Sequence, residues 1–425
     1  VLTSRGLGDV YKRQIYANYI YNASDFSILL TKIKMYTYKI LDNIAQDGID
    51  TLVNNDFIEE VINPDALLIR SHNLIEDDFN ESLKCICRAG AGVNHIPIKK
   101  ATEKGVVIFN TPGGNANAVK ELVICGLLLS SRGILQGHSF IQSLSNQKSD
   151  DLTALVETNK KNFRGSELKG KTIGIIGLGS IGSLLAQSVS SMGMIVIGYD
   201  PNISIDSAWQ LPKEVEKADS LEYLLANSDY ISLHVPLIDE TQNLISKDSI
   251  RHIKKGARLI NLSRGGIVNN KDVLLALENK IISCFVTDFP TPEMVKRSVD
   301  FSDVILLPHL GASTKEAEIN CAIMAAEQAV RFIKDGEIIN SVNFPTVKLS
   351  RSSSFRLVII HKDEPGVIGS ITGEIAAQNL NIADMINKSR NLIAVTIIDL
   401  DEKPSEKVIQ NIKQKNSILS LRMCK

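Results

Sequence analysis

The chain has 425 residues, of which 44% are hydrophobic and 22% are charged, so it has the length and apolar content for roughly two to four domains with buried cores. A formal net charge of -1 argues against nucleic acid or an acidic membrane surface as the main partner, and no apolar run reaches the length of a membrane span. The 6 cysteines include no C-x-x-C pair, so we expect a cytoplasmic protein with reduced, buried thiols and no metal site.

The first residues differ in pattern from the rest of the chain. Residues 1–34 carry no helical or strand period, whereas an alternating run that predicts a strand begins just after Met35. We interpret residues 1–34 as a non-native or disordered extension and Met35 as the native start. A peptide from upstream of Met35, found in the native protein by mass spectrometry, would contradict this interpretation.

Residues 35–115 alternate short strands with helices. Three apolar runs predict buried strands, and polar or glycine residues follow each of them: 66–69, 83–87 and 106–109. Ligand groups collect where the strands of an open α/β sheet end. We therefore expect an anion site formed by Arg70, the glycine turn at 90–92 and the loop at 113–115. For Arg70 alone, a surface ion pair is the competing interpretation.

A glycine motif is the strongest signal in the chain. A long apolar helix is predicted at 118–132, and the polar residues 136–165 are expected to form a surface excursion. An apolar run then leads into Gly177, Gly179 and Gly182 in the G-x-G-x-x-G spacing, followed by an apolar stripe of helical period. In this motif the first glycine allows a tight turn, the second lets a pyrophosphate approach the backbone, and the third lets the helix pack on the strand. The helix N-terminus adds free N–H groups and a positive dipole end.

An acidic residue completes this motif. A second apolar strand ends in Asp200, whose carboxylate can accept hydrogen bonds from the adenosine ribose hydroxyls. Its charge would repel a 2′-phosphate, and Pro201 and Asn202 offer no cation, so the prediction is NAD rather than NADP. The competing interpretation is a glycine turn that binds nothing. The apolar strands on both sides and the spacing of the acid favour dinucleotide binding.

The remaining sequence predicts two further structural features. Strands that alternate with helices predict a parallel, doubly wound sheet, and their runs are 230–236, 257–262, 282–287 and 304–307. After a long amphipathic helix at 314–334, a polar linker leads to a compact unit with the order βαββαβ.

The predicted fold class is α/β, with a Rossmann domain, a flavodoxin-like substrate domain and a small ferredoxin-like C-terminal domain. We assign residues 35–115 and 312–344 to the substrate-binding domain and residues 116–311 to the NAD-binding domain. The linker is residues 345–354, and the C-terminal domain is residues 355–425.

Three polar side chains follow strand ends in the nucleotide-binding half, namely Arg264, Glu293 and His309. Oxidation of a 2-hydroxy acid needs a base for the hydroxyl proton, and histidine suits this role because its unperturbed pKa is about 6.5. A neighbouring carboxylate would orient the imidazole and stabilise its cation, and an arginine would bind the substrate carboxylate with two N–H groups. Asp288 follows another strand and is a candidate acceptor for the nicotinamide amide. Each residue alone is explained as an ordinary surface or loop side chain, but together they favour a site.

The sequence resembles the D-isomer-specific 2-hydroxyacid dehydrogenase family over residues 35–344. The motifs that carry this resemblance are the glycine fingerprint at 178–182, L-H-V-P at 233–236, N-L-S-R-G at 261–265, P-H-L-G-A-S-T at 308–314 and R-A-G-A-G-V at 88–93. The resemblance implies a catalytic trio of Arg264, Glu293 and His309. It also implies NAD contacts at the glycine motif and at Ser180, Ile181, Asp200, Leu262, Ser263, Asp288, Gly311 and Ala312. The implied substrate contacts are Arg70, Ser71, Gly90, Ala91 and Gly92.

The C-terminal unit resembles the ACT regulatory domain, through H-K-D-E-P-G-V at 361–367 and N-L-N-I at 379–382. This resemblance implies a serine effector held by His361, Asp363 and Asn381, with Asp363 standing where an asparagine is often found. The competing interpretation of the tail is a dimerisation module that binds no ligand.

Together the two resemblances imply NAD-dependent oxidation of 3-phospho-D-glycerate to 3-phosphohydroxypyruvate, the first step of phosphorylated serine biosynthesis, by a homodimer or homotetramer. A second hypothesis keeps the chemistry but assigns glyoxylate, hydroxypyruvate or another 2-keto acid as the substrate. A third hypothesis, from a different class, is a non-catalytic scaffold that senses NAD.

Overall fold

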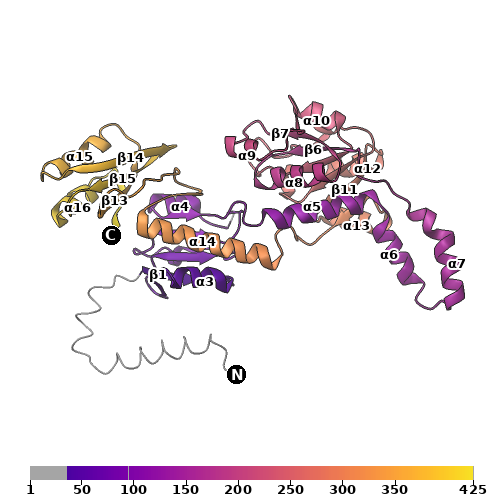
Figure 1. The fold of residues 1–425 in the computed structure, drawn as a ribbon, viewed down its shortest axis with the longest axis horizontal. Helices are drawn as coiled ribbons and strands as arrows, with labels where there is room; N and C mark the ends of the chain where they lie inside the picture. Colours follow the sequence, from indigo (N-terminus) through magenta and orange to yellow (C-terminus); the bar gives the residue numbers. More distant parts are fainter. Residues whose placement is uncertain (1–35, 94, 425) are drawn as a thin grey trace, which may run out of the picture. The chain divides into compact units, whose positions relative to one another are not determined.

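The computed structural model describes residues 36–93 and 95–424, so the extension predicted at 1–34 lies outside the described residues. The chain divides into two compact units. The first unit comprises the described residues up to 89, 93–110 and those from 325 onward, and the second comprises 90–92 and 111–324. Each unit contains its own parallel sheet (Figure 1).

The parallel sheet of the first unit has the strand order β2-β1-β3-β4-β5, which is the flavodoxin-like order and confirms that prediction. All four residues of β3 are buried because both faces of a parallel sheet are covered. Its strands and helices are β1 (Tyr36–Ile40), α3 (Gln46–Val53), β2 (Phe57–Glu59), β3 (Ala66–Ile69), β4 (Cys85–Arg88), α4 (Ile98–Glu103) and β5 (Val107–Phe109).

The second unit is built on a parallel sheet with the order β12-β11-β10-β9-β6-β7-β8, which is the doubly wound Rossmann order with one added strand. The strands are β6 (Thr172–Ile176), β7 (Ile195–Tyr199), β8 (Glu216–Lys217), β9 (Tyr230–Leu233), β10 (Ala257–Asn261), β11 (Ile282–Thr287) and β12 (Val304–Leu306). The helices are α5 (Ala116–Ser131), α8 (Ser180–Ser191), α9 (Ile205–Trp209), α10 (Leu221–Asn227), α11 (Lys247–Ile250), α12 (Asn270–Glu278) and α13 (Pro292–Asp300). Helix α14 (Lys315–Asp335) begins in the second unit, and its residues from 325 onward belong to the first.

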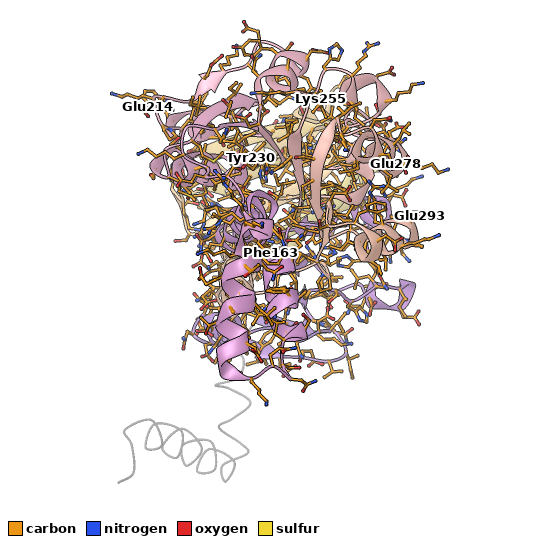
Figure 2. All side chains as sticks on the ribbon, turned by 90° about the vertical axis from the view of Figure 1, so that its right-hand side faces the viewer. Phe163, Glu214, Tyr230, Lys255, Glu278 and Glu293 are labelled. Carbon is orange, nitrogen blue, oxygen red and sulfur yellow. The ribbon has the colours of Figure 1, made fainter. Side chains whose placement is uncertain are left out.

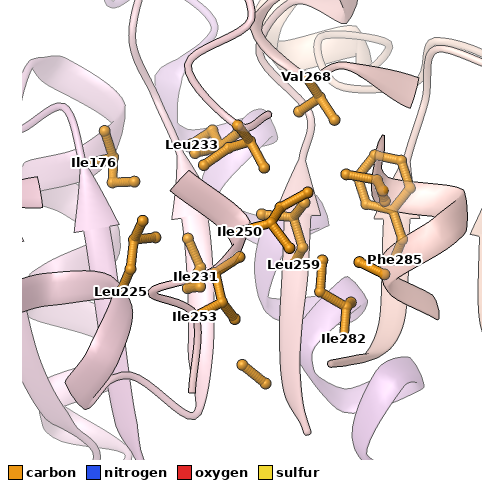
Figure 3. Close-up of a cluster of buried hydrophobic side chains, with 14 of the residues drawn as sticks. Ile176, Leu225, Ile231, Leu233, Ile250, Ile253, Leu259, Val268, Ile282 and Phe285 are labelled. Atoms are coloured by element: carbon orange, nitrogen blue, oxygen red, sulfur yellow. The ribbon is translucent and has the colours of Figure 1, made fainter. Parts of the chain in front are cut away.

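One face of this second sheet carries a continuous apolar core. Ile176, Ile231, Leu259 and Phe285 come from four neighbouring strands and pack in one cluster with Leu225 of α10 (Figure 3). Burying an aliphatic or aromatic side chain of this kind contributes about 1.5–3 kcal/mol. The core therefore fixes the strands on whose carboxyl ends the candidate site is built.

The structure differs from the sequence prediction at residues 136–165, where a surface excursion was expected. This segment forms two helices, α6 (Ile134–Ser143) and α7 (Ser149–Asn159), that project from the end of α5 (Figure 1). Helix α6 has no buried residue, and Ile134, Leu135 and Ile141 are each more than 40% exposed. The apolar side chains of α6 therefore lie on the surface of the second unit rather than in a core.

The C-terminal residues form the predicted βαββαβ arrangement. An antiparallel sheet with the order β14-β15-β13-β16 carries two helices, and this order confirms the ferredoxin-like fold. Its elements are β13 (Phe355–Lys362), α15 (Val367–Ala376), β14 (Ile382–Arg390), β15 (Ile393–Leu400), α16 (Glu406–Lys413) and β16 (Ile418–Cys424). A separate apolar core lies between this sheet and its helices.

Two arginines of this antiparallel sheet bind the C-terminal end of the 21-residue helix α14. Arg356 is buried and donates from Nε and Nη2 to the two carboxylate oxygens of Asp399, at 2.6 and 2.8 Å. Its Nη1 donates to the carbonyl of Asp335 at 3.0 Å. Arg422 donates to the carbonyls of Ile333 and Phe332. These hydrogen bonds satisfy carbonyls at the end of α14, and the carbonyl of Phe332 also accepts one from the amide of Gly336.

Two smaller features bear on the sequence predictions. All 6 cysteines are free, and Cys125 is the one that is exposed, whereas the prediction had all of them buried. Within residues 36–93 and 95–424, no helix is both long and apolar enough to cross a membrane.

Candidate active site

The glycine turn lies between β6 and α8, where the order of the strands reverses. Gly177 has φ 92°, and a Cβ there would lie 2.7 Å from the carbonyl oxygen of His234. A Cβ on Gly182 would lie 2.0 Å from the carbonyl oxygen of Gly177, so only glycine allows α8 to pack this close to the turn. At Gly179 a Cβ would meet nothing within 4 Å. The backbone at Gly179 is therefore open on the side that a side chain would fill, as the approach of a pyrophosphate requires.

Asp200 directly follows β7, and its carboxylate folds back onto the glycine turn. Its Oδ2 accepts a hydrogen bond from the amide of Leu178 at 2.8 Å, and its Oδ1 accepts one from the amide of Asn202 at 2.9 Å. The side chain remains partly exposed. The acid and the glycine turn that the sequence paired are thus in direct contact, and the carboxylate keeps lone pairs for further donors.

Asp288 lies directly after β11 and is almost fully buried. Its Oδ2 accepts a hydrogen bond from the amide of Gly311 at 3.2 Å, whereas its Oδ1 is buried and has no hydrogen-bond partner in the described structure. Burial raises the pKa of this carboxyl, while the Gly311 amide and the positive charges of a protonated His309 and of Arg264 oppose that rise. A buried acceptor without a donor is uncommon in proteins, and it marks a place for a ligand donor.

His309 follows β12 in the left-handed region, with φ 49°. Its ring meets the ring of Phe289 edge-on, with 5.0 Å between the centroids and 68° between the planes. Both rings line an open pocket of about 510 Å³. Its lining residues are Gly265, Asn270, Asp288, Phe289, Pro290, Thr291, Pro308 and His309. His309 is exposed in this pocket, so its imidazole is accessible to a small acid.

Arg264 lies three residues beyond the end of β10 and is partly buried. Its Nη1 donates to the carbonyl of Ser263 at 2.6 Å, and the next residue, Gly265, lines the pocket. Since the charges of Arg264 and His309 both act on Asp288, the structure brings these three side chains into one neighbourhood.

Glu293 is not brought to His309 in this structure. It lies exposed on the first turn of α13, after the N-cap Thr291 and Pro292, and Figure 2 shows its side chain directed outward. Hydrogen bonds from its own backbone amide and from the Thr291 side chain hold the pKa of its carboxyl below the usual range. The helix start thus binds this carboxylate, and its role as the partner of His309 stays a prediction.

The other predicted cofactor residues lie on these same loops of the second unit. Ser180 and Ile181 open α8, and a Cβ on Gly113 would lie 3.4 Å from the hydroxyl of Ser180. Leu262 is buried, and Ser263 donates from its hydroxyl to the side-chain oxygen of Asn261 at 2.9 Å. Gly311 and Ala312 follow His309 directly.

The predicted substrate residues fall in both units. Arg70 and Ser71 belong to the first unit, where they follow β3 and donate their amides to one carboxylate oxygen of Asp42, at 2.7 and 3.0 Å. Residues 90–92 group with the second unit, in which the carbonyl of Gly90 accepts a hydrogen bond from the amide of Thr111. Contact between these residues and a substrate stays a prediction.

The predicted effector residues occupy different environments in the C-terminal domain. His361 is buried, with Nδ1 at 2.7 Å from the carbonyl of Lys362 and Nε2 at 2.9 Å from the hydroxyl of Thr396. Asp363 and Asn381 belong to connecting segments, and Asn381 donates to Asp401 at 2.6 Å. Both ring nitrogens of His361 are therefore engaged within the domain.

Sequence reasoning missed Phe289 and Asn270 as members of the pocket. The signal for Phe289 was its position directly after Asp288, where the chain must turn over the strand ends. Asn270 offered no such signal, because its place in the pocket depends on where α12 begins.

Comparisons with known proteins show the family to which the chain belongs. Residues 127–311 match the model of the D-isomer specific 2-hydroxyacid dehydrogenase, NAD binding domain. The chain is 30% identical over 413 residues to a Schizosaccharomyces pombe protein that is provisionally named a D-3-phosphoglycerate dehydrogenase, covering 89% of this chain and 83% of that protein. The chain belongs to the D-isomer specific 2-hydroxyacid dehydrogenase family.

Other members of this dehydrogenase family show how much of the chain is shared. The D-3-phosphoglycerate dehydrogenase of Bacillus subtilis is 35% identical over 356 residues, which are 80% of this chain and 64% of that enzyme. The chain spans less than two thirds of the length of this and similar curated relatives. The NAD-bound 3-phosphoglycerate dehydrogenase of Entamoeba histolytica superposes with a TM-score of 0.57 at 24% identity, over 73% of this chain and 99% of that one. This similarity supports the fold.

Proposed function

We propose that this chain is an NAD-dependent dehydrogenase that oxidises 3-phospho-D-glycerate to 3-phosphohydroxypyruvate, the first step of phosphorylated serine biosynthesis. The observation that carries the proposal is the grouping of Arg264, His309 and the half-satisfied carboxylate of Asp288 at the ends of three neighbouring strands. The same sheet carries the glycine turn. The relatives named D-3-phosphoglycerate dehydrogenase support the choice of substrate.

The residues present fit a bound NAD. Gly179 leaves the backbone open for the pyrophosphate beside the N-terminus of α8, and Asp200 keeps acceptor capacity for the ribose hydroxyls. The unpartnered Oδ1 of Asp288 would accept the carboxamide N–H of the nicotinamide. When bound, NAD supplies the acceptor for the hydride that leaves C2 of the hydroxy acid.

The chain's own residues supply the remaining chemistry. His309 takes the proton of the C2 hydroxyl as the C2–H bond breaks, so that the alcohol carbon becomes a carbonyl carbon and the imidazole becomes a cation. Arg264 binds the substrate carboxylate and orients the C2–H bond. Asp288 lies close enough to both residues for their positive charges to act on its carboxyl group. Glu293 is the predicted second carboxylate for His309, and this role requires that it leave the start of α13.

For the C-terminal domain we propose the role of an ACT-type regulatory domain with serine as its effector. Asp363 and Asn381 lie in segments accessible to a small molecule, while the inward-facing hydrogen bonds of His361 favour a supporting rather than a contacting role for that residue. Asp363 accepts hydrogen bonds but cannot donate like an amide when ionised, so it is suited to an ammonium group.

The experiment is to follow NADH formation by absorbance with 3-phosphoglycerate, with and without serine, and with NADP as the control cofactor. Turnover with NAD that serine suppresses supports both parts of the proposal. If serine does not change turnover, serine is not an effector, and the C-terminal domain is then interpreted as a dimerisation module. Turnover of glyoxylate or hydroxypyruvate alone would move the assignment to a 2-keto acid reductase. The absence of turnover with every acid, together with NAD binding, would favour the non-catalytic scaffold.

A further inference from the structure

Two buried polar residues lie directly beneath the candidate site. Asn261 is the last residue of β10, and Thr287 is the last residue of β11. They are paired with each other on two neighbouring parallel strands, and each residue is 1% exposed. Buried polar side chains at this level of a sheet need hydrogen-bond partners, and both find theirs in the loop that follows their own strand.

Asn261 binds the loop that carries Arg264. Its side-chain oxygen accepts from the amide of Ser263 at 3.2 Å and from the hydroxyl of Ser263 at 2.9 Å. Its side-chain nitrogen donates to the carbonyl of Arg264 at 2.9 Å. The side-chain amide of Asn261 therefore holds the backbone on both sides of the α-carbon that carries the Arg264 side chain.

Thr287 binds the loop that carries Phe289. Its hydroxyl oxygen accepts a hydrogen bond from the amide of Phe289 at 3.2 Å, and the ring of Phe289 contacts the ring of His309. The carbonyl of Thr287 also accepts a hydrogen bond from the amide of Leu307, two residues before His309. Thr287 is therefore linked to His309 through two short routes, one through each neighbouring loop.

We propose that Asn261 and Thr287 are a pair of positioning residues, which set the places of Arg264 and His309 relative to one another. Because the two residues are partners in one sheet register, the sheet transmits a fixed spacing to both loops. The inference rests on the proposed function, since it assigns the pair to the chemistry of Arg264 and His309. Neither residue touches the substrate in this account.

The variants are chosen to remove the contact and keep the shape. Asn261→Ala removes all three hydrogen bonds of the side chain, and Asn261→Asp keeps the acceptor oxygens while it loses the donor to Arg264. Thr287→Val removes the hydroxyl with little change of volume, and Thr287→Ser restores it. Ser228→Ala is the matched control, because its buried hydroxyl donates to Leu224 at 2.6 Å just before β9, at the opposite end of the strands.

Substitutions at the two residues should change different kinetic constants. Asn261→Ala should raise KM for 3-phosphoglycerate, and Thr287→Val should lower kcat, each on the order of 10- to 100-fold, the range expected for a misplacement of up to about 1 Å. Thr287→Ser should recover the wild-type kcat. In the Arg264→Gln background, Asn261→Ala should cause no further loss, because the positioned group is already absent.

Hydrogen–deuterium exchange gives a readout that does not depend on turnover. Exchange should rise in residues 262–266 for the Asn261 variants and in 288–292 for Thr287→Val, and it should stay unchanged in the glycine turn at 177–182. Unchanged exchange in these loops, or losses that multiply in the Arg264→Gln background, would overturn the inference. A wild type that oxidises no 2-hydroxy acid would refute the proposed function, while the exchange result would still decide whether the pair positions the loops.

Discussion

The carboxylate of Asp200 accepts a hydrogen bond from the amide of Leu178, within the glycine turn, at 2.8 Å. An acid that is separated from this turn by a helix and a strand is thereby fixed beside the backbone that would bind a dinucleotide. Its negative charge is held in place by two amides, so it cannot easily move away from a 2′-phosphate.

We therefore expect Asp200 to set the choice of cofactor. Asp200→Asn should keep the shape of the side chain and remove the charge, so the preference for NAD over NADP should fall by roughly tenfold or more, a change of about 1.4 kcal/mol per tenfold. The ratio of kcat/KM for the two cofactors measures this effect. Asp219→Asn, at an exposed aspartate just after β8, is the control and should leave the ratio unchanged. An unchanged ratio in Asp200→Asn would refute this role.

Substitution by alanine should affect stability at one glycine of this turn and NAD binding at another. Gly182→Ala places a methyl group 2.0 Å from a backbone oxygen, so it should destabilise the second unit by about 1–3 kcal/mol. Gly179→Ala meets no atom within 4 Å and should leave stability unchanged, but it should weaken NAD binding on the order of tenfold. Thermal unfolding and calorimetric titration with NAD separate the two effects. Equal effects of both variants on stability would contradict the geometry.

The proposed base, His309, can be replaced without disturbing its loop. His309 has φ 49°, a conformation that asparagine tolerates better than alanine does. His309→Asn should therefore keep the fold while kcat falls on the order of 10²- to 10⁴-fold, the usual contribution of a general base. His252→Asn, at the amino end of β10, is the matched control. A variant at position 309 that kept the wild-type kcat would exclude His309 as the base.

The buried ion pair of the C-terminal domain should make stability depend on pH. Burial alone would raise the pKa of Asp399, but the hydrogen bonds from Arg356 and Ser352 outweigh it and hold that pKa below its usual range. A lowered carboxyl pKa stabilises the fold above the unfolded pKa of about 3.9, and this contribution is lost as the pH falls through the folded value.

Removal of one member of this pair is the direct test. Asp399→Asn leaves the Arg356 guanidinium buried without its counter-charge, so it should destabilise the fold by about 3–5 kcal/mol at pH 7. Urea unfolding at pH 7 and near pH 3 should show a smaller loss on acidification for the variant than for the wild type. Equal losses for both proteins would show that this pair does not carry the acid sensitivity.

Much of the fold followed from the sequence because its strands are continuous apolar runs that end at glycine or polar residues. Gly177, Asp200 and Asp288 were found in this way because each directly follows a strand of the second sheet, and His309 comes three residues after the end of β12. The helical form of residues 134–143 was not predicted, and α6 buries no residue.

The supporting contacts of the site were less accessible to prediction. Asn261 looks like any other residue at the end of a strand, and its role depends on how residues 262–264 turn back over it. The position of Glu293 was equally hidden, because Thr291 and Pro292 start a helix where a loop was expected. Such details depend on local hydrogen bonds, which leave no periodic pattern in the sequence.

The contact between the C-terminal domain and α14 has a consequence for how the proposed regulatory role of that domain can be tested. Arg356 and Arg422 provide donors for the carbonyls of Phe332, Ile333 and Asp335, so a chain shortened at the linker would leave the end of this helix without them. Truncation, the usual way to ask what a regulatory domain does, would damage a helix of the catalytic part at the same time. Loss of activity in such a fragment would then result from local unfolding at the end of α14 rather than from the loss of a regulatory effect. Point substitutions on the exposed side of the domain, which leave both arginines in place, separate the two.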